Sequence, residues 1–390
     1  MEKNILNVAA EVIGGAGRER AADEVLRAEL RKRGGISRED GRQISGAVFA
    51  YYRWREWLNW KEKPEQQIER ALEMQRAFNE NPEAISDDDL RRAAPKWISE
   101  FMEVTPGWLR SLQAEPKLWL RARPEQGNAL AEKLGDCRAA GEGALADSLL
   151  YEGESDLFRT GEFQSGEFEL QDISSQVVGL LCAPQPGETW WDACAGEGGK
   201  LLHLCDLMQG KGLVWASDRA EWRLRRLKQR AARARVFNYR SVVWAENAKL
   251  PTRTKFDGVL VDAPCSGVGT WQRNPHARWT TRAEDVKELA EVQKELLRRA
   301  AGTLKPGGKL IYSVCTLARA ETTEVAELIG REFPELEGLR LPDFLRRNEG
   351  ATPHVKDMSE APGGQIWIWP QEIEGNGMFI AGWRNAGKGA

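Results

Sequence analysis

Apolar side chains recur every three or four positions through the first part of the chain, which is the period of an amphipathic helix. Ile5, Val8 and Val12 form one such stripe, and Gly34-Gly35 ends a second helix. Ser37, three residues before Asp40, resembles the start of a capping box for a third helix. The pattern predicts an all-helical domain over residues 1–112.

The pattern becomes mixed between residues 113 and 175. Residues 118–123 alternate like a strand, 126–140 have helical spacing, and 146–151 again indicate a strand. A stretch this short buries too little apolar surface to fold alone. We therefore expect a small α+β subdomain that packs on the part that follows.

Strand and helix patterns alternate from residue 176 to residue 390, which is typical of a doubly wound α/β sheet. Strands are predicted at residues 189–192, 212–218, 240–245, 256–262 and 307–317. A long helical pattern at 283–304 separates the last two strands. The final part, 365–369 and 377–383, predicts a closing hairpin.

The strands at 256–262 and 307–317 both run into residues that carry chemistry. The first ends at Asp262-Ala-Pro-Cys265, and the second reaches Cys315. Two strands joined by a helical crossover are parallel, so their carboxyl ends meet at one edge of the sheet. We expect Asp262, Cys265 and Cys315 to converge there.

Charge changes this picture only locally. The chain has 390 residues, 56 basic and 59 acidic, for a net charge of −3, so any nucleic-acid surface must be local. Two groups of basic residues are candidates, and for each the alternative is a solvated helix face: Arg18, Arg20, Arg42, Arg53 and Arg55, and the eight basic residues from Arg219 to Arg235.

Metal sites and membrane segments are not expected. The six cysteines include no C-x-x-C pair, and only three histidines are available as ligands. No 18 apolar residues run together, and the N-terminus has no apolar leader segment. We expect a cytoplasmic protein that contacts no membrane.

A glycine-rich loop, Asp192-Ala-Cys-Ala-Gly-Glu-Gly-Gly-Lys200, follows the first strand of the α/β part. Glycines at a strand-to-helix turn let the backbone approach a ligand closely. A phosphate-binding P-loop fits poorly, because Cys194 and Leu201 stand where it needs glycine and a hydroxyl residue. Asp218, which ends the next strand, is suited to accept hydrogen bonds from ribose hydroxyls. The combination predicts an adenosine-type cofactor, with a purely structural turn as the alternative.

The two thiols indicate a specific reaction. Carbon 5 of a pyrimidine accepts a methyl group only after a nucleophile adds to carbon 6, and a thiolate adds and leaves well. One cysteine should attack while an acid hydrogen-bonds the base near N3, and a second group should remove the carbon-5 proton.

These motifs together resemble the Sun/Fmu family of RNA cytosine-5 methyltransferases, most closely the bacterial ribosomal-RNA RsmB type. The resemblance spans nearly the whole chain. It implies a NusB-like RNA-binding domain over 1–112, an RRM-like subdomain over 113–175, and a Rossmann-type domain over 176–390 that binds S-adenosylmethionine. It also implies ribosomal RNA of the small subunit as the substrate.

The resemblance assigns roles residue by residue. Cys315 is implied as the nucleophile, Cys265 as the residue that assists release, Asp262 as a contact to cofactor and base, and Lys200 as their neighbour. From its position alone, Lys200 is an ordinary lysine at a helix start. The implied cofactor-binding residues are Cys194, Ala195, Gly196, Glu197, Gly198, Gly199, Lys200, Asp218, Asn247 and Asp262.

The sequence departs from the family pattern at several positions. Glu197 replaces a usual proline, Leu201 a usual threonine, and Asn247 a common acid, while Glu321-Thr322 stands where a Glu-Asn pair is typical. These departures bear on cofactor affinity rather than on the type of reaction, because both cysteines are present.

Other functions stay open at this stage. A cytosine-5 methyltransferase acting on DNA, with Cys265 as nucleophile, or on tRNA is one alternative, and a non-catalytic RNA-binding ribosome assembly factor is another. Trp271 and Trp279 either stack on a flipped base or pack in a core. We expect a monomer with RNA as its partner.

Overall fold

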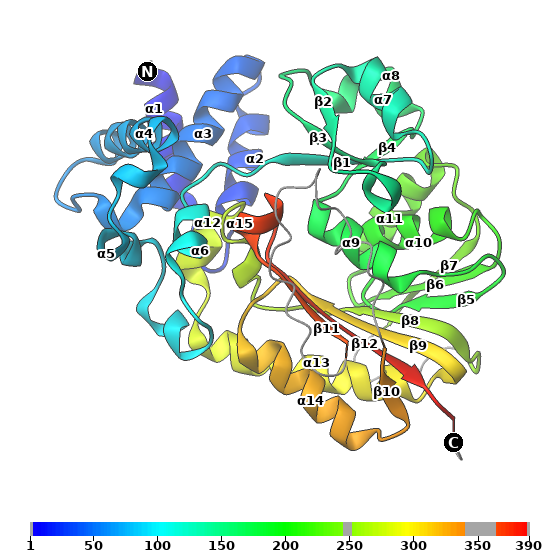
Figure 1. The fold of residues 1–390 in the computed structure, drawn as a ribbon. Coiled ribbons are helices and arrows are strands. Elements are labelled where there is room, and N and C mark those ends of the chain that lie inside the picture. The colour runs from blue at the N-terminus through cyan, green and yellow to red at the C-terminus, as the bar shows by residue number, and fades with distance from the viewer. Residues whose placement is uncertain (1–2, 245–251, 340–363, 388–390) are drawn as a thin grey trace. The chain divides into compact units, whose positions relative to one another are not determined.

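The computed structural model describes residues 3–244, 252–339 and 364–387. The chain forms two compact units (Figure 1). The helical unit comprises residues 1–116 and 267–285, and the α/β unit comprises 117–266 and 286–390. A segment that follows the Pro-Cys motif in sequence is therefore part of the helical unit.

Amphipathic helices build the helical unit, as predicted. Their bounds are α1 Lys3–Gly15, α2 Ala22–Lys32, α3 Arg38–Trp54, α4 Pro64–Glu80, α5 Asp87–Leu90, α6 Pro106–Ser111 and α12 Pro275–Thr280. Ser37 caps α3, because its Oγ accepts from the backbone N–H of Asp40 at 3.0 Å. Ile5, Val8, Val12 and Ile44 are buried in one core, which confirms the predicted stripe.

A buried arginine holds the segment 267–285 within the helical unit. Arg278 is fully buried, and its guanidinium donates to the carbonyl oxygens of Ala93 and Leu112 at 2.8 Å each and of Trp271 at 3.3 Å. A cation in such a site needs several acceptors. Burial, followed by the charge of Arg53, holds its pKa well below the ordinary value for arginine.

The α/β unit begins with a four-stranded antiparallel sheet in the order β2-β3-β1-β4. Its strands are β1 Leu118–Ala122, β2 Cys137–Ala139, β3 Ser148–Tyr151 and β4 Phe168–Leu170, and its helices are α7 Gly127–Leu134 and α8 Gly161–Gln164. The strands at 118–123 and 146–151 are confirmed. The helix predicted at 126–140 is too long, because Gly135 has a positive φ of 64° and the chain re-enters the sheet as β2.

The large sheet has the order β10-β12-β9-β8-β5-β6-β7, and β11 pairs with β12. Strands β5 to β9 are parallel, and β12 runs antiparallel beside β9. The bounds are β5 Thr189–Asp192, β6 Leu213–Asp218, β7 Tyr239–Val243, β8 Phe256–Asp262, β9 Leu304–Val314, β10 Leu336–Gly338, β11 Gln365–Ile368 and β12 Met378–Asn385. The predicted α/β sheet and closing hairpin are confirmed.

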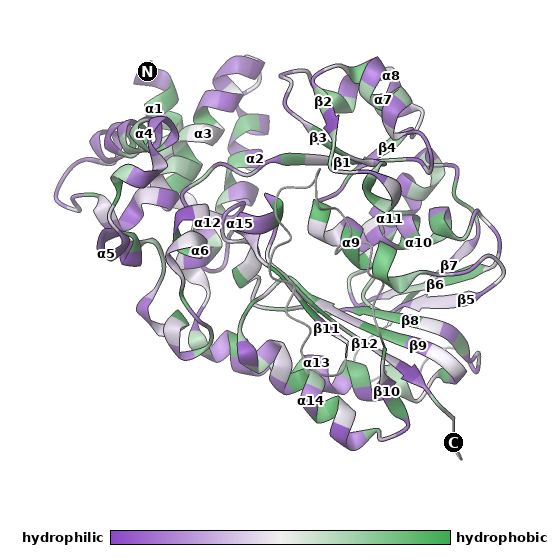
Figure 2. Cartoon of the chain, in the orientation of Figure 1, coloured by the Kyte–Doolittle hydropathy of each residue, from purple (hydrophilic) through white to green (hydrophobic). Residues whose placement is uncertain are grey.

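Helices cover both faces of this sheet (Figure 1). One face carries α9 Ile173–Cys182, α10 Gly199–Leu207 and α11 Glu221–Arg233, and the other carries α13 Ala283–Ala301 and α14 Thr323–Glu332. Neighbouring strand residues alternate between the two cores, as Trp190 and Trp191 do. Helices α13 and α14 are mixed hydrophobic and polar along their length (Figure 2), as expected for helices with one buried side.

The predicted ends of two elements differ from the structure. The helix predicted at 283–304 ends at Ala301, and β9 already begins at Leu304. Lys305-Pro-Gly-Gly308 is therefore part of a strand with a register irregularity beside β8. Among the described residues, none of the helices is long and apolar enough to cross a membrane.

Candidate active site

Strands β8 and β9 bring the two cysteine motifs together. The strands are parallel, with Asp262 in register with Ser313. The chain continues from β8 to Cys265 and from β9 to Cys315, and the two Sγ atoms lie 3.3 Å apart with both residues partly exposed. The predicted convergence of Asp262, Cys265 and Cys315 at the carboxyl edge is confirmed.

A partly exposed set of polar groups, which we call the open network, lies at this edge. Lys200 Nζ donates to Asp262 Oδ2 at 2.7 Å and to Ser175 Oγ at 3.2 Å. Ser313 Oγ donates to the other carboxylate oxygen of Asp262 at 2.8 Å. The side chains of Lys200 and Asp262 are 11% and 29% exposed. The open network can therefore exchange an internal partner for a ligand.

Neighbouring groups stabilise the protonated form of Lys200. Burial lowers the pKa of Lys200, but the Asp262 carboxylate, by its charge and its hydrogen bond, more than offsets this effect and leaves the pKa raised. Cys315 and Asp192 contribute in the same direction. The site thus contains a lysine that keeps its proton.

The glycine loop links β5 to α10. Gly196 and Gly198 have positive φ angles of 54° and 87°, which favour glycine. A Cβ at Gly198 would come within 2.7 Å of Leu227, whereas a Cβ at Gly196 would meet nothing within 4 Å. The loop is therefore packed on α11 at Gly198 and open at Gly196, next to the N-terminus of α10 at Gly199.

Asp218 fixes this loop from the end of β6. Its Oδ2 accepts from Gly196 N at 3.0 Å, and its Oδ1 accepts from Ala220 N at 2.8 Å. Ala195 is held as well, since its N–H donates to the carbonyl of Ser217 at 2.8 Å. Each carboxylate oxygen therefore accepts one backbone N–H and retains capacity for a second donor.

Glu197 is directed toward helix α11. Its carboxylate pairs with Arg226 at 3.0 Å, and its carbonyl accepts from Arg230 at 3.2 Å. The glutamate that departs from the family pattern thus ties the loop to this basic helix. Cys194 is half-buried in the same loop. Asn247 lies outside the described residues.

A second set of polar groups, which we call the buried network, includes the residues that directly follow the two cysteines and was not predicted. Glu321 is fully buried and accepts from Ser266 N at 2.9 Å, Gln293 Nε2 at 3.0 Å and Thr316 Oγ1 at 3.1 Å, and also from Ser266 Oγ. Tyr312 Oη donates to the carbonyl of Glu321 at 2.6 Å and to Gln293 Oε1 at 2.9 Å. One carboxylate thereby joins the residues that follow Cys265 and Cys315.

Glu321 was visible in the sequence only as half of a departing Glu-Thr pair. Burial raises its pKa, while the hydrogen bonds from Ser266, Gln293 and Thr316 oppose that rise. An acid after a strand, followed by an ordinary amphipathic helix, gives no sign of four converging donors. Only the fold brings residues 266, 293 and 316 to it.

Asp192 is another buried acid that the site prediction missed. It ends β5, is 1% exposed, and has a pKa raised to about 8. Burial is the main cause, and the neighbouring charge of Asp262 adds to it, while Lys200 opposes it. The sequence signal that could have identified Asp192 is its position at a strand end, directly before the glycine loop.

The structure also decides between the alternative roles of Trp271 and Arg53. Trp271 does not stack on a base, because it is fully buried against Trp97 and Trp108 in the helical unit. Arg53 does not belong to an RNA-facing surface, because it is 3% exposed and donates to Gln75 at 2.8 Å.

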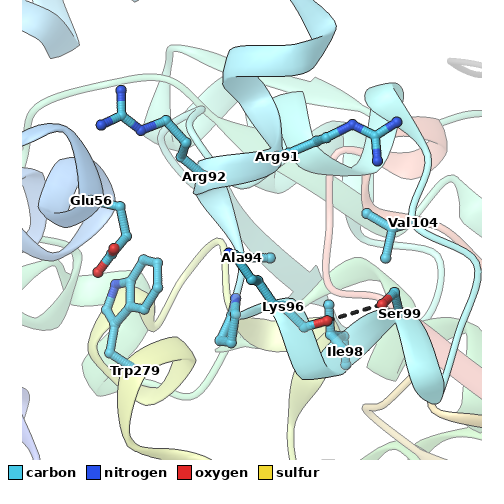
Figure 3. Close-up of a pocket in the computed structure, with 10 residues that line it drawn as sticks. Glu56, Arg91, Arg92, Ala94, Lys96, Ile98, Ser99, Val104 and Trp279 are labelled. Atoms are coloured by element: carbon cyan, nitrogen blue, oxygen red, sulfur yellow. Dashed lines mark hydrogen bonds between the residues drawn. The ribbon is translucent and has the colours of Figure 1, made fainter.

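Trp279 lines a pocket of about 660 Å³ in the helical unit, with Glu56, Arg91, Arg92 and Lys96 also at its wall (Figure 3). Its ring is fixed by a hydrogen bond from Nε1 to the carbonyl of Tyr52 at 2.6 Å. The part of the chain that the structure describes contains no cluster of three histidine, cysteine or acidic residues suited to a metal ion.

Comparison with known proteins agrees with the fold of the large sheet. The family model of the 16S rRNA methyltransferase RsmB/F matches residues 179–384. The probable ribosomal RNA small subunit methyltransferase B of Bacillus subtilis is 34% identical over 325 residues, which cover 77% of this chain and 69% of that protein.

Two crystal structures have a similar fold. PH0851 is 20% identical with a TM-score of 0.77, over 98% of this chain and 99% of that chain. A methyltransferase homolog protein from Pyrococcus horikoshii is 26% identical with a TM-score of 0.60, over 72% of this chain and 90% of that chain. The sheet is therefore that of a Rossmann-like methyltransferase.

Proposed function

Because this chain belongs to the RsmB/F family of 16S rRNA methyltransferases, we propose that it methylates carbon 5 of a cytosine in ribosomal RNA through a covalent cysteine adduct. The observation that carries the proposal is the pair of thiols 3.3 Å apart beside the Lys200–Asp262 ion pair. Addition and elimination at one pyrimidine ring need two groups that reach the same side of a small target.

The loop residues fit S-adenosylmethionine, the methyl donor of the family. Gly196 leaves open space at the loop, the amides at the start of α10 face the same end of the sheet, and Asp218 is oriented by two backbone N–H groups. In our proposal Asp218 accepts hydrogen bonds from ribose hydroxyls, and Cys194 to Lys200 line the site. The bound cofactor supplies the electrophilic methyl group.

We propose that Cys315 is the nucleophile. Its thiolate forms a bond to carbon 6 of cytosine. The electron pair of the 5,6 double bond moves to carbon 5 and is delocalised toward N3, near which Asp262 hydrogen-bonds the base. Lys200 keeps Asp262 oriented through the 2.7 Å ion pair. Carbon 5 becomes nucleophilic only in this adduct, and so the methyl group is accepted there.

Cys265 then assists release. Its thiolate takes the proton from carbon 5, the electron pair re-forms the 5,6 double bond, and the bond from carbon 6 to Cys315 breaks to return a thiolate. The 3.3 Å separation between the two sulfur atoms allows one thiol to donate to the other, so a proton can pass between them. The distance between the two sulfur atoms does not tell which cysteine attacks and which assists release. The assignment of Cys315 as nucleophile rests on the family resemblance.

We also propose that the helical unit contains a NusB-like RNA-binding domain and that the four-stranded sheet is RRM-like. The helical composition of residues 1–112 and the antiparallel sheet with flanking helices support this proposal. Both parts would present the RNA, and the enzyme would act as a monomer.

The decisive experiment traps the covalent adduct. Cys265→Ala is incubated with S-adenosylmethionine and 16S rRNA transcript, then resolved by denaturing electrophoresis. We expect a protein–RNA band of reduced mobility, because addition proceeds while release is blocked. Cys315→Ala should give no such band.

Cys137→Ala is the matched control, since Cys137 lies on β2 of the other sheet. It should turn over like the wild type. An adduct from Cys315→Ala and none from Cys265→Ala would exchange the two roles. A wild type inert toward labelled cofactor on ribosomal RNA would instead favour a binding factor, and turnover on DNA or tRNA alone would change the substrate.

A further inference from the structure

Helix α11 and the residues after it expose a basic and aromatic surface that the proposed reaction does not use. The helix packs through Leu224, Leu227 and Ala231, which are buried. Its opposite side and the turn that follows are exposed. We call this the α11 surface, and it consists of Trp222, Arg223, Arg225, Lys228, Arg235 and Phe237.

The charge of this region is opposite to that of the chain as a whole. Residues 219–235 include eight basic side chains and one acidic side chain, Glu221, within a protein whose net charge is −3. Such a concentration creates a local positive potential that attracts a polyanion.

Part of the cluster is structural and part is available. Arg226 pairs with Glu197, while Arg230 and Arg233 pair with the buried Glu169. By contrast, four basic side chains of the α11 surface have no acidic partner within the described residues: Arg223, Arg225, Lys228 and Arg235. The unpaired cations lie on the exposed side, where a ligand can reach them.

Two aromatic side chains accompany these cations. Trp222 is 50% exposed and Phe237 is 76% exposed. The guanidinium groups of Arg223 and Arg226 lie 5.4 and 5.5 Å from the centre of the Trp222 ring, which orients the indole. Exposed aromatics among arginines are typical of surfaces on which unpaired bases stack.

The position of α11 links this surface to the candidate site. Trp222 stands four residues after Asp218, at the carboxyl end of β6, and the helix runs away from that edge for about 20 Å at 1.5 Å per residue. That length matches a few nucleotides of extended single strand. Figure 1 places α11 beside α10 on one face of the sheet.

We propose that the α11 surface binds a single-stranded segment of the substrate RNA, with phosphates on Arg223, Arg225 and Lys228 and one unpaired base stacked on Trp222. The proposal rests on the proposed function, which makes RNA the polyanion. It assigns to this helix the binding of sequence outside the reacting cytosine.

The test compares two double variants of equal charge. Arg225→Ala/Lys228→Ala removes two cations of the α11 surface. Lys287→Ala/Arg331→Ala removes two exposed cations from α13 and α14, on the other face of the sheet. Binding of fluorescein-labelled oligouridine and of 16S rRNA transcript is measured by anisotropy over a range of salt concentrations.

We expect the α11 variant to bind RNA more weakly and the slope of log affinity against log salt to decrease by about 1.4, since each phosphate contact on a single strand contributes about 0.7. The α13/α14 variant should match the wild type. Trp222→Ala should weaken binding by about tenfold with an unchanged salt slope, because it removes stacking rather than charge. The cofactor affinity and kcat at saturating RNA should stay constant in every variant.

The outcomes separate this inference from the proposed function. If Cys265→Ala forms its adduct while all the α11 variants bind RNA like the wild type, the surface assignment is wrong and the reaction stands. If the α11 variants lose binding to vesicles of phosphatidylcholine with phosphatidylglycerol but keep RNA affinity, the surface belongs to lipid. If the wild type binds neither RNA and Cys265→Ala forms no adduct, both proposals fail.

Discussion

Two polar networks lie near the cysteine pair, and the carboxylates at their centres, Asp262 and Glu321, differ in their access to water. In the open network the side chains of Lys200 and Asp262 are 11% and 29% exposed. In the buried network Glu321, Thr316 and Gln293 are fully buried. Both networks place a carboxylate near the thiols, yet only one of these carboxylates is accessible to a substrate.

This difference indicates that the two carboxylates have different roles. Each oxygen of Asp262 has one protein hydrogen-bond partner, so it keeps acceptor capacity for a base. Glu321 accepts four hydrogen bonds from protein donors, which use its capacity and fix the chain on both sides of the thiols. We infer that the open network takes part in the reaction and that the buried network positions the two cysteines.

The largest effect is expected from Asp262→Asn. The amide keeps the size of the side chain but loses the negative charge beside Lys200 and the acceptor geometry for the base. We expect the single-turnover rate of methyl transfer to decrease by about a thousandfold, equivalent to about 4 kcal/mol. The matched control is Asp257→Asn, since Asp257 lies on the same strand and pairs with Lys305 at 2.7 Å.

Asp257→Asn should leave the rate unchanged. A rate for Asp262→Asn within tenfold of the wild type would contradict a role of the open network in the reaction, because Asp262 would then matter no more than the structural Asp257–Lys305 ion pair.

Glu321→Gln should act through position. The amide group would present N–H donors toward the donors of Ser266 or Gln293, and so the loops that carry the cysteines would separate. We expect kcat to decrease by about a hundredfold, about 2.7 kcal/mol, while the cofactor affinity measured by calorimetry stays constant. Glu332→Gln is the control, because Glu332 at the end of α14 forms a partly exposed ion pair with Arg298 of α13.

If Glu321 positions the cysteines, its substitution should also slow the formation of the covalent adduct. Adduct formation by Cys265→Ala should slow by the same factor when Glu321→Gln is added, because both steps need the thiols in place. If the double variant traps RNA at the rate of Cys265→Ala, the buried network stabilises the fold without positioning the nucleophile.

The contrast also explains how much the sequence could predict. The hydrophobic period and the parallel-crossover rule are enough to predict that Asp262, Cys265 and Cys315 lie at the ends of neighbouring strands. The loop Cys194 to Lys200 and Asp218 were recognisable for the same reason. Their local pattern is enough to place them.

The buried network was not predictable in this way. Its donors come from residues 266, 293 and 316, and their meeting depends on how α13 and the segment after β9 pack. Asp192 was missed because a single acid at a strand end has no pattern of its own. Arg53 was placed on the wrong surface, and the choice between stacking and core packing for Trp271 stayed open, because burial in a helical core is a property of tertiary packing.

Asp192 should make stability depend on pH. Its pKa in the folded protein is about 8 against 3.8 for an ordinary aspartate. The folded state therefore holds a proton that the unfolded state releases, so this contribution to stability is complete below about pH 4 and is lost as pH rises toward 8. Asp192→Asn removes the titration.

We expect the free energy of unfolding of Asp192→Asn, relative to wild type, to increase by about 1 kcal/mol per pH unit between pH 5 and 7. Urea unfolding across that range measures it. A constant difference would mean that Asp192 is ionised in the folded state and that its neighbours in the open network compensate its charge.

The smallest effect, and the sharpest comparison, comes from removing one hydroxyl from each network. Ser313→Ala deletes the 2.8 Å bond to Asp262, and Thr316→Val deletes the 3.1 Å bond to Glu321 while keeping the shape of the side chain. Water can replace the lost donor at the partly exposed Asp262, so we expect Ser313→Ala to cost about 0.5 kcal/mol of stability. No water reaches Glu321 as easily, so Thr316→Val should cost about 1.5 kcal/mol. Equal losses of unfolding free energy for the two variants would show that solvent access does not distinguish the networks. The catalytic role of Asp262 and the positioning role of Glu321 would then rest only on the methyl-transfer rates of their variants.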